Sequence, residues 1–197
     1  MKTIVMAAIS LLLVTCSPLL AQEEPLLGEY HFTAGLGAMI MQHVTFETDD
    51  AGVQVGFDAY RHVGQSWYVG AEIGFGGSVG FLTAESEIAM YELNGKRVFG
   101  LGRVVRLDLG AGLSYNHVSY SENNLFGPDD GPEIDEWVFG AQALANLHLK
   151  LGWALLGAHV KYMLTQDVPG VAELEGLEKG WDYSNLTLGV QAGFLIR

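Results

Sequence analysis

Cysteine is almost absent from this chain, since the only one among its 197 residues is Cys16. It lies within an N-terminal stretch that looks like an export signal, so the mature protein would have no disulfide, no thiol nucleophile and no thiolate metal ligand. Residues 13–16, Leu-Val-Thr-Cys, have the general shape of a lipobox, which makes lipidation of Cys16 an alternative. Because Thr15 is a poor residue before a lipidated cysteine, we expect an ordinary signal.

Long hydrophobic runs are missing too. The apolar residues at 4–14 are too few to span a bilayer, which takes ~20 apolar residues. With Lys2 before them, and with Ala21 followed by Gln22 as a cleavage site, they are typical of a secretory signal peptide. We therefore expect a signal peptide at residues 1–21 and one domain at residues 22–197.

Basic residues are scarce, because 10 Lys and Arg stand against 23 Asp and Glu, for a formal net charge of −13. This balance argues against nucleic acid as a partner. The acids concentrate around residues 49–50, 85–92, 122–136 and 167–182. They fit solvated loops, and as an alternative they fit divalent cations bridging to lipopolysaccharide, or an extracellular partner.

Motifs for catalysis and cofactors are absent as well. The chain has no Walker-type phosphate loop, no dinucleotide fingerprint, no Gly-x-Ser-x-Gly elbow and no His-Glu-x-x-His pair. We predict no catalytic residue, no metal site, no cofactor-binding residue and no cofactor.

What the chain does have is an alternation of apolar and small or polar residues. In residues 105–115, Val105, Leu107 and Leu109 alternate with Arg106, Asp108 and Gly110, and the pattern continues to Tyr115. It recurs over residues 32–40, 53–59, 67–75, 139–149, 156–164 and 186–196. A period of two predicts strands with one apolar face.

The face opposite the apolar one is rich in glycine, which decides how these strands are placed. A solvated exterior would carry Lys and Glu, whereas glycine suits a cramped lumen. The apolar face would then meet lipid, as in membrane barrels whose strands run apolar-out and polar-in. The glycines are Gly35, Gly37, Gly56, Gly70, Gly74, Gly110, Gly112, Gly140, Gly157, Gly189 and Gly193.

Seven segments leave the barrel one strand short, because a bacterial barrel has an even number of antiparallel strands and no open edge. We place the missing strand at about residues 86–98, where alternation is only partial. Short turns are expected near residues 62–65, 99–103 and 151–153, and long links near 42–51, 78–85, 119–136 and 166–182. Two belts of aromatic residues are expected at the strand ends; they include Tyr60 and Phe99 on the periplasmic side, and Tyr183 on the outer side.

The alternating segments resemble the outer-membrane β-barrel family of OmpA- and OmpX-like proteins. The resemblance runs from about residue 30 to residue 197, and rests on this pattern and on the segments LGAGLSY at 109–115 and LGVQAGF at 188–194. It implies an all-β, eight-stranded antiparallel up-and-down transmembrane barrel in the bacterial outer membrane, with its N-terminus in the periplasm. We expect a monomer whose partners are outer-membrane lipid and lipopolysaccharide. Family members usually end on an aromatic residue, whereas this chain ends on Arg197.

Charged residues on the lumenal face form the candidate site. Alternation sends Asp58, Glu72, Arg106, Asp108 and Lys161 inward, into a lumen that side chains just fill. We expect Asp58, Arg106 and Asp108 at one shallow depth and Glu72 and Lys161 further up, with Arg106 paired to an acid. Separate hydration of these groups is the alternative.

The resemblance implies a non-enzymatic role in envelope integrity, adhesion or resistance, exercised through four outer loops. The alternative is a lipid A-modifying enzyme, a deacylase or acyltransferase, with His117 or His159 as a general base. The deacylase motif resembles His-x-Ser-Asn, but Ser184 and Asn185 follow Asp182 and Tyr183, so the histidine is missing. A third interpretation is a soluble periplasmic barrel.

Overall fold

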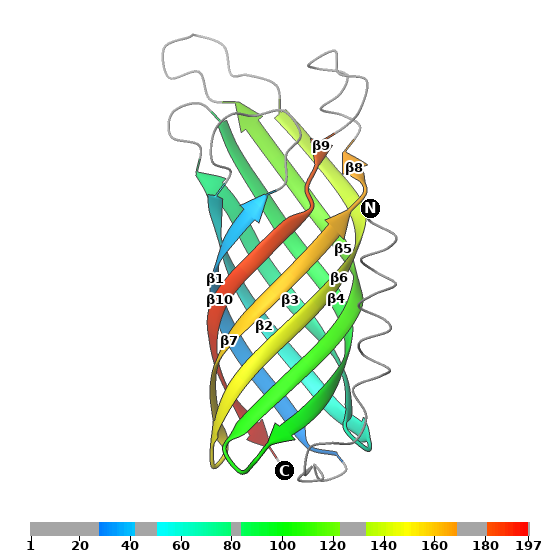
Figure 1. Cartoon of the computed structure of the whole chain (residues 1–197). Coiled ribbons are helices and arrows are strands. Elements are labelled where there is room, and N and C mark those ends of the chain that lie inside the picture. The colour runs from blue at the N-terminus through cyan, green and yellow to red at the C-terminus, as the bar shows by residue number, and fades with distance from the viewer. Residues whose placement is uncertain (1–27, 42–50, 80–83, 123–132, 169–180, 197) are drawn as a thin grey trace.

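The chain folds as a closed barrel in a computed structural model (Figure 1). The structure describes residues 28–41, 51–79, 84–122, 133–168 and 181–196, so the expected signal peptide at 1–21 lies outside the described residues. Within the described residues, no helix has the length and hydropathy to cross a membrane.

Eight antiparallel strands form the barrel, and the predicted fold class is thereby confirmed. They are β1 (Tyr30–Met41), β2 (Ala51–Gly64), β3 (Trp67–Val79), β4 (Ala84–Leu101), β5 (Val105–Glu122), β6 (Glu133–Leu151), β7 (Ala154–Thr165) and β10 (Asn185–Ile196). Each pairs with its neighbour in the chain, except that β8 (Asp167–Val168) and β9 (Trp181–Asp182) form a separate small sheet between β7 and β10. The pairing of β1 with β10 closes the barrel and leaves it without an open edge.

Short turns join alternate strands at the end of the barrel that also holds the C-terminus (Figure 1). The turns after β4 and β6 pass through Gly102 and Gly152, whose φ angles of 79° and 70° are left-handed and favour glycine. The longer connections leave the opposite end. They are shorter than expected, because β3 continues to Val79 and β4 starts at Ala84, while β5 continues to Glu122 and β6 starts at Glu133.

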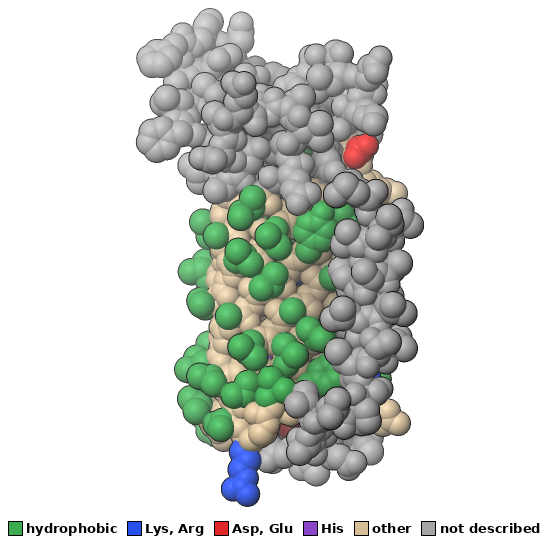
Figure 2. Space-filling view, viewed as in Figure 1, with side chains coloured by type: hydrophobic (Ala, Val, Ile, Leu, Met, Phe, Trp, Pro, Cys, Tyr) green, Lys and Arg blue, Asp and Glu red, His purple; other side chains and the backbone are tan. Residues whose placement is uncertain are grey.

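The outer wall of the barrel is apolar, because the alternation points the large hydrophobic side chains outward. Leu113 is 70 % exposed and Val190 is 64 % exposed, whereas Ser114 and Gln191, next to them in the chain, are buried. Figure 2 shows hydrophobic side chains over much of the height of the visible wall. Such a large apolar surface is what contact with hydrocarbon requires of a barrel.

The lumen itself has two parts, and the sequence pattern predicted only one of them. Towards the long-connection end it is filled by an apolar cluster made of Met39, Ile88, Met90, Val118, Val138, Met163, Val168 and Tyr183. Ile88 and Met90 point inward from β4, while Ala89 and Tyr91 point outward. Because both faces are apolar there, this strand shows only weak alternation in the sequence.

Two of the aromatic residues expected in the interfacial belts lie in the lumen instead. Tyr60 is 2 % exposed and lies in the lumen with Tyr68, because it is one of the alternate residues of β2 that point inward. Tyr183 belongs to the apolar cluster of the lumen. Phe99 is only 4 % exposed, but it has an outward-facing position on β4, in register with Leu107 of β5, and the Arg97 guanidinium lies 5.1 Å from its ring centre. The assignments of Tyr60 and Tyr183 to the belts were therefore wrong, whereas Phe99 stays on the outer face at the short-turn end of β4.

Glycines on the lumenal face let neighbouring strands and side chains approach closely. A Cβ atom added at Gly110 would lie 2.8 Å from the Gly95 carbonyl oxygen and 2.8 Å from the Lys96 Cβ. One added at Gly189 would lie 2.5 Å from the His159 Cε1. Side chains larger than hydrogen therefore do not fit at these positions unless the neighbours move.

We expect Gly110→Ala to destabilise the barrel by about 1–3 kcal/mol, because it overpacks the lumen. Gly95→Ala is the matched control, since Gly95 lies on the neighbouring strand and an added Cβ there would meet nothing within 4 Å. Urea unfolding of the refolded variants measures both. Equal destabilisation by the two substitutions would contradict the assignment of Gly110 to the crowded face.

A candidate functional site in the barrel lumen

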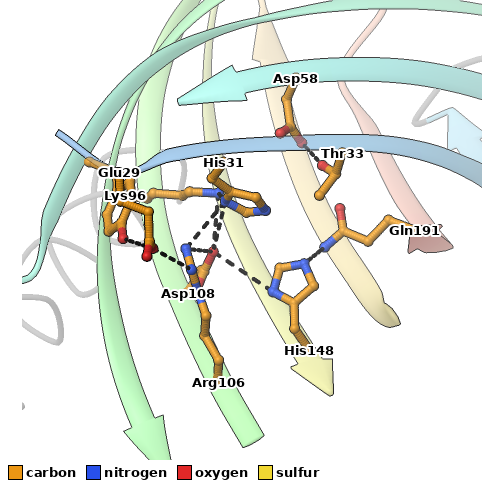
Figure 3. A network of polar contacts seen from close by, with 10 residues as sticks. Glu29, His31, Thr33, Asp58, Lys96, Arg106, Asp108, His148 and Gln191 are labelled. Carbon is orange, nitrogen blue, oxygen red and sulfur yellow. Dashed lines mark hydrogen bonds and ion pairs between the residues drawn. The ribbon is translucent and has the colours of Figure 1, made fainter. Parts of the chain in front are cut away.

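The lumen between the apolar cluster and the short turns is lined by charged and polar side chains. They come from nearly every strand, because every second residue of each strand points into the same narrow lumen. Figure 3 shows the part near the short turns, where side chains from opposite walls point towards one another. Two layers can be distinguished by their ion pairs.

Asp108 is the centre of the layer near the short turns. The Arg106 Nε atom donates a 2.7 Å hydrogen bond to Asp108 Oδ1, and Arg106 Nη2 donates a 3.2 Å bond to Oδ2. The Lys96 Nζ atom lies 3.1 Å from the same Oδ2. All three side chains are buried, so two cations share one carboxylate away from bulk solvent.

Two histidines from other strands extend this layer across the lumen. His31 Nδ1 accepts hydrogen bonds from Lys96 Nζ at 2.7 Å and from Arg106 Nη2 at 3.2 Å, which requires the proton of this ring to be on Nε2. His148 Nε2 accepts a 2.6 Å bond from the Gln191 amide. The rings of His31 and His148 meet edge to face, with 5.4 Å between their centres. These contacts tie β1, β4, β5, β6 and β10 together.

Tyrosine rings cover the cations on the side of β2 and β3. Lys96 Nζ lies 3.7 Å from the centre of the Tyr60 ring, and the Arg106 guanidinium carbon lies 5.0 Å from that of Tyr68. Both geometries are attractive cation–π contacts. The Tyr68 hydroxyl donates a 2.7 Å hydrogen bond to Glu29 Oε1, which also lies 4.0 Å from Arg106 Nη1.

Lys161 is the centre of the second layer, midway along the barrel. Its Nζ donates hydrogen bonds to Glu72 Oε1 at 2.8 Å and to Glu92 Oε1 at 2.7 Å. The other oxygen of Glu92 accepts bonds from the Gln142 amide at 3.0 Å and the Asn94 amide at 3.2 Å. Because Lys161 is on β7 and Glu72 is on β3, this layer crosses the lumen from wall to wall.

Asp58 has a different environment. Its Oδ2 accepts a hydrogen bond from the Thr33 hydroxyl. In the register of β2 and β3, Asp58 lies directly opposite Glu72, so it belongs to the second layer and not to the depth of Arg106 and Asp108. No Lys or Arg among the described residues lies within ion-pair distance of it.

The five residues predicted from the sequence are thus separated into three environments. Arg106 forms an ion pair with Asp108, and Lys161 forms one with Glu72. Asp58 accepts a hydrogen bond from Thr33. The prediction missed Lys96, Glu92, His31 and Glu29, which complete both layers. Lys96 and Glu92 have the inward parity of β4, but that parity was hidden because the alternation of this strand is weak.

The geometry of the two layers suits closure of the barrel better than chemistry on a substrate. Every ion pair of these two layers joins groups that are buried or nearly so, and the layers and the apolar cluster follow one another along the lumen. Within the described residues, no group of three or more His, Cys, Asp or Glu side chains is arranged to hold a metal ion. The candidate bases of the enzymatic alternative do not meet, because His117 points outward beside Asp135 and Trp137 while His159 points into the lumen.

No family model matches the chain, and no curated protein matches it. Several solved structures do. The crystal structure of Neisserial surface protein A (NspA) matches with a TM-score of 0.62 at 12 % identity, covering 86 % of this chain and 98 % of that one. Ail of Yersinia pestis matches with a TM-score of 0.57 at 14 % identity, covering 87 % of this chain and 100 % of that one. OprG of Pseudomonas aeruginosa matches with a TM-score of 0.56 at 14 % identity, covering 87 % of this chain and 97 % of that one. At these identities the likeness shows the fold, an eight-stranded barrel like those of small outer-membrane proteins.

Proposed function

We propose that this protein is a non-enzymatic integral protein of the bacterial outer membrane, which uses a closed barrel to hold four loops at the cell surface. One observation supports this above the others: the barrel wall is apolar outside, while its lumen is filled by paired charges and an apolar cluster. A pore needs an open lumen and a soluble barrel needs a polar exterior. This barrel has neither.

The topology supports one orientation of the barrel in the membrane. If the signal peptide is removed after Ala21, the N-terminus remains in the periplasm, on the side where β1 begins. The short turns and the C-terminus are at that same end (Figure 1). The four longer connections would then face outward, which is the usual arrangement in outer-membrane barrels.

The sequences of those connections suggest the chemistry of a partner. The segments 42–50, 80–83, 123–132 and 169–180 contain one basic residue, Lys179. Their acids are Glu47, Asp49, Asp50, Asp129, Asp130, Glu173, Glu175 and Glu178. Ail of Yersinia pestis has been solved with the heparin analogue sucrose octasulfate, but loops this acidic would repel such a polyanion. We propose that they contact lipopolysaccharide through divalent cations, or bind a basic surface of an extracellular partner.

Conductance in planar bilayers tests whether the barrel is closed. We expect the purified protein to insert into membranes, to resist carbonate extraction, and to migrate faster on gels before boiling than after. Once inserted, it should show no steady large conductance. Stable channels in most insertions would overturn the closed lumen, and extraction by carbonate would overturn the membrane placement.

Lipid A analysis separates this function from the enzymatic alternative. We expect mass spectra of lipid A from a deletion strain and from the complemented strain to be identical. A changed acylation pattern that returns with the gene would show the protein to be a lipid A-modifying enzyme.

A further inference from the structure

The charges in the lumen do not balance. Near the short turns, the cations Lys96 and Arg106 are matched by Asp108 and Glu29. In the second layer, Lys161 is shared by Glu72 and Glu92, and Asp58 lies opposite Glu72. Among the described residues, this layer therefore holds three carboxyl groups and one ammonium group.

A small cavity lies at this layer, with room for about one or two particles of the size of water. Its lining includes Asp58, Glu72, Gln54, Asn146 and Gln191. The Oδ1 atom of Asp58 is buried and makes no hydrogen bond to any described residue. Gln191 uses its amide nitrogen on His148, so its amide oxygen is available to the cavity.

A buried carboxylate oxygen without a partner is costly, and proteins pair such charges with a cation or a metal. The lining supplies carboxylate and amide oxygens, which are the ligands that hard cations prefer. A divalent ion is disfavoured because the Lys161 ammonium group also lines the cavity. Among the described residues, the three carboxyl groups of this layer are not arranged as a three-ligand metal site, which also argues against a divalent ion.

We propose that this cavity binds one alkali-metal cation, with Asp58 as its charged ligand and the neighbouring carboxylate and amide oxygens completing the coordination. The cation supplies one of the two positive charges that the second layer lacks. It thereby becomes part of the structure that closes the barrel.

The test compares the stability of the refolded protein in NaCl, in KCl and in N-methyl-D-glucamine chloride at equal ionic strength, since the organic cation is too large for the cavity. In mixtures that exchange N-methyl-D-glucamine for the alkali cation at constant ionic strength, each tenfold rise in alkali-cation concentration above the dissociation constant should raise the folded-to-unfolded ratio about tenfold. Asp58→Asn should abolish this dependence. In N-methyl-D-glucamine chloride, Asp58→Asn should be at least as stable as the wild type, because it removes one of the two unbalanced negative charges.

Glu87→Gln is the matched control, because Glu87 is an exposed acid of β4, and it should retain the full cation dependence. Equal wild-type stability in all three salts would overturn the proposal, and so would a dependence that persists in Asp58→Asn. Equilibrium dialysis of the wild type with radioactive Na⁺ serves if the variant does not fold. About one saturable site per barrel supports the proposal, and no saturable binding overturns it.

Discussion

Replacing Asp108 with asparagine is expected to destabilise the folded barrel by about 3–5 kcal/mol, because it leaves two buried cations without their shared partner. Lys96 and Arg106 both contact Asp108, and all three side chains are buried. Asparagine has nearly the same shape as aspartate, so the change tests charge and not packing. Urea unfolding followed by tryptophan fluorescence gives the free energy of unfolding.

Two further variants make the result interpretable. Asp135→Asn removes an acid whose side chain is 63 % exposed and should change stability by less than about 1 kcal/mol. Arg106→Met combined with Asp108→Asn should cost less than the sum of the single changes, because the double variant restores the balance of charge. Additive losses, or an Asp108→Asn variant as stable as Asp135→Asn, would contradict the ion-pair network.

Val190→Arg is expected to destabilise the barrel in lipid by about 2–4 kcal/mol, the cost of a charged residue at the bilayer midplane. Val190 lies in the middle of β10 and is 64 % exposed on the outer wall. Ile196→Arg is the matched control on the same strand and the same face. Because Ile196 ends the strand, its arginine can reach the interface, where the cost falls to about 0–1 kcal/mol.

The two arginine variants are compared by urea-dependent folding into lipid vesicles. If Val190→Arg folds as well as Ile196→Arg, β10 does not cross the hydrocarbon region with Val190 near the midplane. If both variants fail to the same extent, the cost does not depend on depth, and the assignment of Val190 to the midplane is wrong.

The sequence was sufficient to predict the barrel because the two faces of each strand meet different environments, and alternate residues along the strand match one environment or the other. In residues 105–115, one parity is apolar and the other holds Arg106, Asp108 and Gly110, so the two faces can be read directly. The strand β4 was harder, because Ile88 and Met90 fill the apolar part of the lumen while Ala89 and Tyr91 face outward. Where both faces are apolar, a period of two disappears from the sequence although the strand continues.

The partners within the candidate site could be predicted only in part. Asp108 and Arg106 have the same parity on one strand and are two residues apart, so their pairing is a local property. The contacts of Lys161 with Glu72 and Glu92 join residues 89 and 69 positions apart. They depend on which strands face one another across the lumen, and on the register that places Asp58 opposite Glu72. Neither is encoded in the pattern of a single strand.

The most direct test of a lipid-facing wall is a depth profile along β10. Single cysteines can be placed at Leu186, Leu188, Val190, Ala192 and Ile196, because the only native cysteine, Cys16, lies in the expected signal peptide. Each is spin-labelled in the protein reconstituted in bilayers, and its collisions with oxygen and with a water-soluble nickel complex are compared. We predict that the ratio of oxygen to nickel accessibility peaks near Val190 and falls towards Leu186 and Ile196. A flat profile, with every site open to the nickel complex, would contradict the membrane-spanning barrel.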